Sequence, residues 1–119
     1  MGLDTFAGYP RHHPKYEGEG GEETFSLIPS ELFPENNLCG GLFSGGGNSF
    51  RGKVYNEMIE DITNISLYNE VIPLRYVKDM VSRIEKHISI HKDTDPELLY
   101  LLGWFQVVVK EEAAVYGWW

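Results

Sequence analysis

The sequence predicts an α+β fold in which a small sheet packs with two long helices and one shorter helix. Three observations lead to this prediction. Apolar residues recur at alternating spacings of three and four over 74–88, the segment 97–109 is apolar on nearly every side, and both chain ends suit strands. We expect a sheet built from an N-terminal strand, a central strand around residues 38–44 and a C-terminal strand.

The N-terminal third combines one ordered segment with irregular chain. Residues 2–9 suit a strand that places Leu3, Thr5 and Ala7 on one side. Residues 10–24 mix prolines, glycines and charges, which is typical of a mobile surface loop. The stretch "PSELFPE" predicts a single helical turn with Ser30 as its cap.

The second half is more regularly patterned. We expect the shorter helix to start near Asn56, because apolar residues follow it at helical spacing, and residues 66–72 to form an extended link. Pro73 suits the start of the first long helix, whose apolar stripe runs to Ile88. Thr94 is the predicted cap of the second long helix, with Glu97 reaching back in a capping box.

Length, composition and cysteine content indicate one domain spanning residues 1–119. The single cysteine, Cys39, excludes an internal disulfide framework and a cysteine-based zinc ribbon, and it fits a reducing cytosol. No apolar run approaches the ~20 residues of a membrane span. We therefore expect a cytoplasmic protein that binds no membrane.

Charge is distributed unevenly along the chain. The net charge is −8, with seven acidic and two basic residues in 1–36, and eleven acidic and six basic residues in 57–119. Residues 37–56 carry two bases and no acid. Duplex nucleic acid would be repelled by most of this surface, whereas a small anion could bind at the one positive region.

That region, "GGLFSGGGNSFRGKVYN", is the main candidate for a binding site. Its glycines allow main-chain amides to form an anion-binding nest, and in an extended segment Arg51 and Lys53 would point to one face. A turn that uses its glycines only for chain reversal, with Arg51 paired to an acid, explains the pattern equally well. The expected ligand-binding residues are Gly45, Gly46, Gly47, Asn48, Ser49, Arg51, Lys53, Tyr55 and Trp118.

The same segment matches the spacing of a phosphate-binding loop, but it departs from it at one position. Gly47, Gly52 and Lys53 fit G-x-x-x-x-G-K, yet Val54 stands where an NTPase needs Ser or Thr for magnesium. No convincing parallel strand precedes the loop. We therefore expect no NTPase activity and no cofactor.

Histidines and aromatic residues supply two further candidates. His87 and His91 share a helix face, which suits metal ligands, but no H-E-x-x-H pattern is present and a helix C-terminus also favours imidazole. We expect no metal site. The aromatic C-terminus, ending in Trp118 and Trp119, fits core packing, a contact between copies in a homo-oligomer, or a ligand pocket.

Catalytic machinery is not evident. Cys39 has no histidine near it in sequence, and the serines lack a G-x-S-x-G context. Paired acids such as Glu111 and Glu112 look like solvated helix faces and caps. We assign no catalytic residue.

Four segments together resemble a group of small proteins from bacterial and phage genomes. These segments are "MGLDTFA", "LCGGLFSGGGNSFRGKVYN", "SLYNEVIP" and "GWW", so the resemblance covers most of the chain outside residues 9–35. It implies a bacterial or phage setting and carries no activity, ligand or site residue with it.

Three functions remain open from the sequence. The first is a non-catalytic protein that holds a small anionic, nucleotide-like ligand at the Gly-rich loop. The second is an acidic interaction or inhibitor module that binds a host protein of basic charge. The third is a small phosphoester hydrolase with His87 or His91 as its base.

Overall fold

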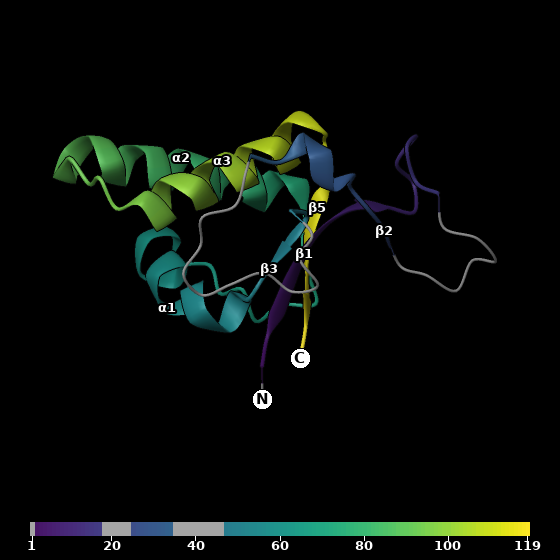
Figure 1. Cartoon of the computed structure of the whole chain (residues 1–119), viewed down its shortest axis with the longest axis horizontal. Coiled ribbons are helices and arrows are strands. Elements are labelled where there is room, and N and C mark those ends of the chain that lie inside the picture. The colour runs from purple at the N-terminus through teal and green to yellow at the C-terminus, as the bar shows by residue number, and fades with distance from the viewer. Residues whose placement is uncertain (1, 18–24, 35–46) are drawn as a thin grey trace.

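In the computed structural model, which describes residues 2–17, 25–34 and 47–119, an antiparallel sheet packs against three helices (Figure 1). This arrangement confirms the predicted α+β class. The strands are β1 (Asp4–Pro10), β2 (Phe25–Leu27), β3 (Ser49–Phe50), β4 (Val71–Ile72) and β5 (Ala114–Trp118). The helices are α1 (Gly52–Thr63), α2 (Leu74–His91) and α3 (Pro96–Lys110), with a short 3-10 turn at Ser30–Leu32.

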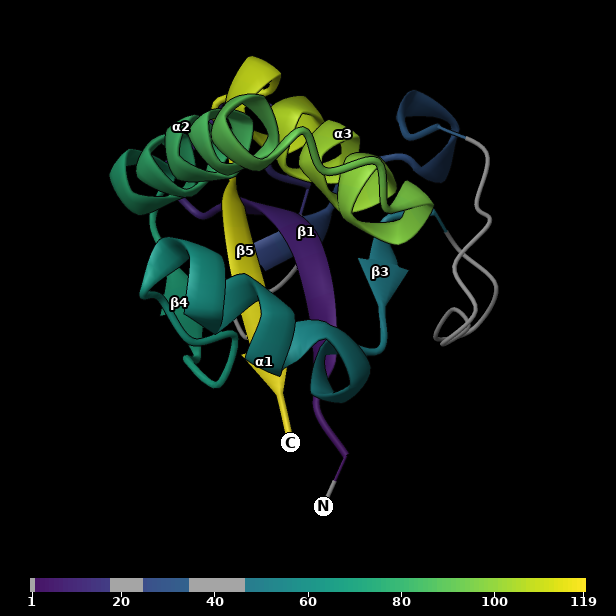
Figure 2. The ribbon, with the colours of Figure 1, turned by 90° about the vertical axis from the view of Figure 1, so that its left-hand side faces the viewer.

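Strand β1 lies at the centre of the sheet. It pairs with β5 along one side, and β2 and β3 share its other side, while β4 extends the sheet beyond β5. The two ends of the described chain thus lie side by side, as Figure 2 shows for β1 and β5. The predicted N-terminal and C-terminal strands are confirmed. The expected strand at 38–44 falls outside the described residues.

All three helices cover one face of the sheet (Figure 2). Leu3, just before β1, and Thr5 and Ala7 within it point to this side and are buried, as expected from the alternation of a strand. The core between sheet and helices is filled by large side chains that are almost wholly buried. They include Phe50, Ile59, Val77, Met80, Ile84, Leu98, Leu101, Trp104 and Phe105.

The structure corrects three predicted helix starts. Helix α1 begins at Gly52, four residues before Asn56, whose side chain instead accepts a hydrogen bond from the amide of Leu67 at 2.6 Å. Helix α3 is capped by Asp95, not Thr94, because the Asp95 carboxylate accepts from the amide of Glu97. Ser30 begins its 3-10 turn and does not cap it.

Glu111 ties the chain after β1 to the end of α3, so the expectation that it is solvated was wrong. Its carboxylate accepts hydrogen bonds from Lys15 Nζ at 2.9 Å and from the Tyr9 hydroxyl at 2.7 Å, and both lower the pKa of Glu111. The Glu111 carbonyl also lies 2.8 Å from His13 Nε2. The first part of the expected loop, residues 11–17, is therefore anchored, while residues 18–24 lie outside the described chain.

None of the helices in the described ranges combines the length and apolar character needed to cross a bilayer.

Replacing Gly52 tests how closely α1 approaches the sheet. A Cβ at this position would overlap Thr5 Oγ1 and come within 2.9 Å of the Leu3 side chain. Gly52→Ala should therefore lower the free energy of unfolding by about 1–3 kcal/mol, the usual cost of overpacking.

Gly103→Ala is the matched control, because the nearest atom to its new Cβ would be Pro34 Cγ at 3.8 Å. This variant lies inside helix α3 and should gain up to about 1 kcal/mol from helix propensity. Urea unfolding measures both, and equal stabilities would contradict the close contact at Gly52.

Candidate functional site

The described part of the Gly-rich segment anchors the fold. The carbonyl of Gly47 accepts from Trp104 Nε1 at 2.9 Å, and Asn48 Nδ2 donates to the carbonyl of Ile28 at 2.8 Å. Ser49 is buried in β3. The Asn48 side-chain donor is thus engaged inside the fold and Ser49 is buried, while Gly47 contributes its carbonyl, and not its amide, to the bond with Trp104. Gly45 and Gly46 fall outside the described residues.

The remaining predicted residues do not converge on one point. Arg51 and Lys53 are exposed, but helix α1 starts between them, so the extended geometry expected to align them is absent. The amide of Lys53 donates to the carbonyl of Leu3. Tyr55 is only 4% exposed and its hydroxyl bonds to Glu97, so its ring faces the core, not a ligand.

His87 lines a hollow together with Asp93, and His91 lies beside His87. His87 Nε2 is 3.1 Å from Asp93 Oδ2, and the rings of His87 and His91 are 4.6 Å apart. A backbone hydrogen bond from Asp95 and the contact with His87 lower the pKa of Asp93. The hollow, about 480 Å³, is lined by no hydroxyl or thiol, and the described residues hold no group of three metal-ligating side chains.

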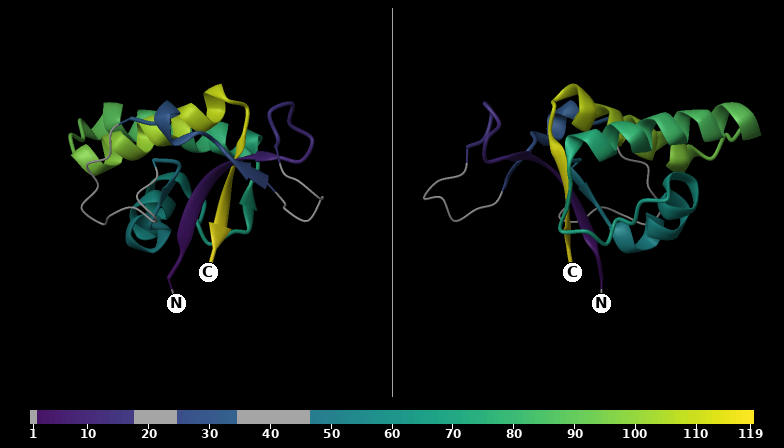
Figure 3. Two further views of the ribbon diagram at one scale, coloured as in Figure 1. Left: turned by 45° about the vertical axis from the view of Figure 1, so that its right-hand side comes forward. Right: turned by 180° about the vertical axis from the view of Figure 1, so that it is seen from behind.

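The sheet face opposite the helices is the most unusual surface of the described chain. Strand pairing determines which residues lie on this face, because directly paired residues point to the same side of a sheet. Phe6 pairs with Tyr116, and Tyr116 also pairs with Val71. Figure 3 shows this face without a helix over it. We call it the outer face, and it comprises Asp4, Phe6, Phe25, Leu27, Val71, Tyr116 and Trp118.

The outer face is apolar where an uncovered sheet face normally carries polar side chains. Trp118 is 71% exposed, Leu27 50% and Val71 45%. The ring of Phe25 stacks on Tyr116, with centroids 3.9 Å apart and planes 9° from parallel. Tyr116 itself is only 7% exposed, so it supports Phe25 from below, and the surface that can receive a partner is formed by its more exposed neighbours.

Two hollows flank Tyr116 on this side of the molecule. One, of about 380 Å³, reaches from Pro10 and His12 to Arg75 at the start of α2. The other, of about 430 Å³, lies at the end of β5 and is lined by Phe25, Glu70, Tyr116, Gly117, Trp118 and Trp119. Trp118, placed with the Gly-rich loop by sequence reasoning, belongs here, on the face opposite α1.

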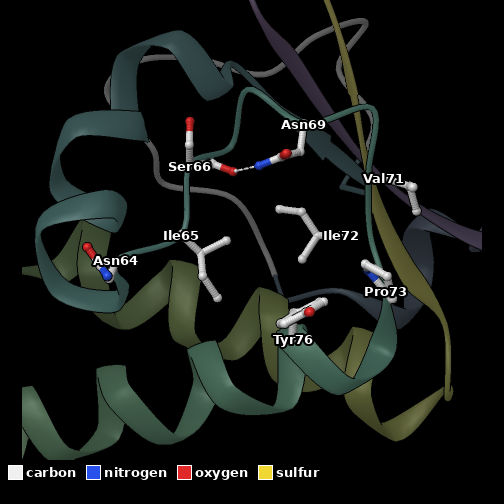
Figure 4. A pocket seen from close by; sticks show the side chains of 8 residues that line it. All are labelled: Asn64, Ile65, Ser66, Asn69, Val71, Ile72, Pro73 and Tyr76. Carbon is white, nitrogen blue, oxygen red and sulfur yellow. Dashed lines mark hydrogen bonds between the residues drawn. The ribbon is translucent and has the colours of Figure 1, made fainter.

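A further hollow of about 300 Å³ lies between the end of α1 and the start of α2 (Figure 4). Ile65 and Ile72 form its apolar part, and Tyr76 lies at its edge. The amide of Asn69 is already engaged, since it donates to the carbonyl of Ser66 at 2.7 Å. Its lining in the described part of the chain contains no acid, lysine, arginine or histidine, so this hollow offers little for recognition of a charged group.

Sequence reasoning noted the C-terminal aromatics but missed Phe25, Glu70 and Val71 as their neighbours. Tyr116 and Trp118 are two residues apart, which places them on the same side of any strand. This spacing was the available signal. Which side faces the helices depends on the pairing with β1, and no local pattern reveals that.

Burial under Phe25 and its neighbours raises the pKa of Tyr116 to about 12. Titration of tyrosinate absorbance in the wild type and in Tyr116→Phe should isolate this group, with a midpoint near 12 instead of the usual ~10. Because the folded-state pKa is raised, its contribution to stability is present below pH ~10 and is lost as the pH rises toward 12. A midpoint near 10 would show that Tyr116 is solvated.

Comparison with protein-family models, curated proteins and solved structures finds no significant match to this chain. Its function must therefore be argued from the surface itself.

Proposed function

We propose that this chain is a non-catalytic interaction module that binds a basic protein partner through the outer face of its sheet. The observation that carries the proposal is the aromatic, apolar composition of a sheet face that none of the helices in the described ranges covers. Interfaces are enriched in Tyr, Trp and Phe at their centre, with polar and charged residues around them. The outer face has this composition, with Tyr116 and Trp118 near Asp4 and Glu70.

Charge favours a basic partner. The chain carries a net charge of −8, and Asp4 lies directly opposite Trp118 in the β1–β5 ladder. Opposite charge accelerates encounter and disfavours acidic competitors. The single cysteine and the resemblance to bacterial and phage proteins make a bacterial cytoplasm the proposed setting.

A small anionic ligand at the start of α1 is a second candidate. Arg51 and Lys53 are exposed there, neither forms an ion pair with a described carboxylate, and the first turn contains no acid. Helix N-termini favour anions. This candidate ranks lower, because the predicted neutral donors around it are engaged in the fold.

Photo-crosslinking tests the interaction module. A benzoyl-phenylalanine side chain placed at Val71, on the outer face, should give adducts with a Lys/Arg-rich protein in bacterial cells that express the full chain. The same group placed at Ile90, which is 63% exposed on α2, is the control and should give none of these adducts. Trp118→Ser should reduce the Val71 adducts strongly.

Equal adducts from both positions would contradict a specific outer-face interaction. Adducts formed only with a second copy of the chain, or only with acidic proteins, would contradict a basic partner.

Thermal unfolding tests the second candidate with inorganic phosphate and a panel of nucleotides. A ligand that binds only the folded chain raises the melting temperature. Arg51→Ala combined with Lys53→Ala should abolish the rise, while Lys78→Ala combined with Lys86→Ala removes the same charge from α2 and should leave it intact. The idea fails if no ligand raises the melting temperature, or if both double variants lose the effect equally.

A further inference from the structure

We propose that the hollow at the end of β5 binds the guanidinium group of an arginine on the partner protein. The inference rests on the proposed function and names the chemistry that part of the outer face would recognise. The hollow measures about 430 Å³ and is lined by aromatic residues together with one acidic residue. Its lining residues are Phe25, Glu70, Tyr116, Gly117, Trp118 and Trp119.

Three of the aromatic walls are held in place before any ligand arrives. Phe25 and Tyr116 are stacked, and the Trp119 ring meets Tyr68 edge-to-face with centroids 5.7 Å apart. Gly117 allows the Asn69 carbonyl and the Trp119 ring to lie close to β5, because a Cβ at this position would come within 2.5 Å of the carbonyl and 3.2 Å of the ring. A pre-organised site loses less entropy on binding.

Glu70 is fixed beside these rings by its backbone. Its carbonyl accepts a hydrogen bond from the amide of Gly117 at 3.2 Å, which holds the preceding loop against β5. Among the described residues, the lining contains no lysine, arginine or histidine to neutralise the carboxylate. Asp4, opposite Trp118, adds a second negative charge on the same face. The hollow therefore repels anions and attracts cations.

The combination of flat rings and a carboxylate selects among cations. A guanidinium group is planar, stacks on aromatic faces and donates two parallel hydrogen bonds to a carboxylate. An ammonium group is a compact, strongly hydrated charge that gains less from a flat ring. An uncharged apolar group would fill the hollow but leave Glu70 without a partner, which is costly once water is excluded. Arginine meets all of these demands.

Binding is tested with a short peptide of alternating glycine and arginine and a matched peptide that carries uncharged citrulline. The indole signals of Trp118 and Trp119 in the ¹⁵N-labelled full chain report occupancy. We expect saturable shifts of both signals with the arginine peptide and none with the citrulline peptide. A lysine peptide should bind at least about threefold more weakly than the arginine peptide, since it lacks the stacking and paired hydrogen bonds.

Substitutions at Glu70 and Trp118 measure the contributions of the carboxylate and of the aromatic rings to binding separately. Glu70→Gln should weaken arginine binding at least about tenfold, while Glu60→Gln, an exposed position on α1, removes the same charge and should change affinity less than twofold. Trp118→Ala should also weaken binding, followed through Trp119. Because Trp118 and Glu70 are exposed, these variants should keep the wild-type fold.

Several results would overturn the inference: no saturable shift, equal binding of the citrulline or the lysine peptide, equal loss in the two glutamine variants, or full affinity in Trp118→Ala.

Crosslinking from Val71 tests the interaction module independently of the arginine site. If the arginine peptide fails to bind but Val71 adducts with a basic protein persist in Glu70→Gln, the arginine site is contradicted and the interaction module is still supported. Peptide binding without such adducts would contradict the module and leave a cation site.

Discussion

The register between β1 and β5 is the constraint on which the rest of the structure depends. It joins segments more than a hundred residues apart and pairs Phe6 with Tyr116 and Ala7 with Val115. A slip of one residue would exchange the two faces of a strand. In the observed register Ala7 and Val115 enter the core, whereas Phe6, Tyr116 and Trp118 are turned away from the helices.

The core explains the stability of the fold without the outer face. Helices α1, α2 and α3 bury large side chains against one side of the sheet, and β3 adds Phe50, whose ring meets Trp104 edge-on with centroids 4.8 Å apart. Trp118, by contrast, leaves most of its surface in water. Large exposed aromatic groups cost solubility and add little to folding, which is why we propose a partner for this face.

The long elements were predictable and the contacts between them were not. Periodicity identified α2, a capping signature followed by an apolar run identified α3, and strand-forming residues identified β1 and β5, because these patterns are local. Pro96 in fact indicates Asp95 as the cap of α3, since proline favours the first helical position and the cap precedes it. Strands β2 and β4 have three and two residues, and they exist only through pairing with β1 and β5. The candidate site could not be predicted for the same reason, because Phe25, Glu70 and Trp118 come together only in the folded sheet.

The openness of the outer face is the central claim, and the three tryptophans of the chain measure it directly. A soluble paramagnetic agent broadens the indole N–H signals of side chains that reach solvent. Trp104 is wholly buried and donates to the carbonyl of Gly47, whereas Trp118 and Trp119 are exposed. We therefore expect two indole signals to broaden strongly and that of Trp104 to be protected. Protection of Trp118 in the free chain would mean that the outer face is already covered, and this would contradict the account.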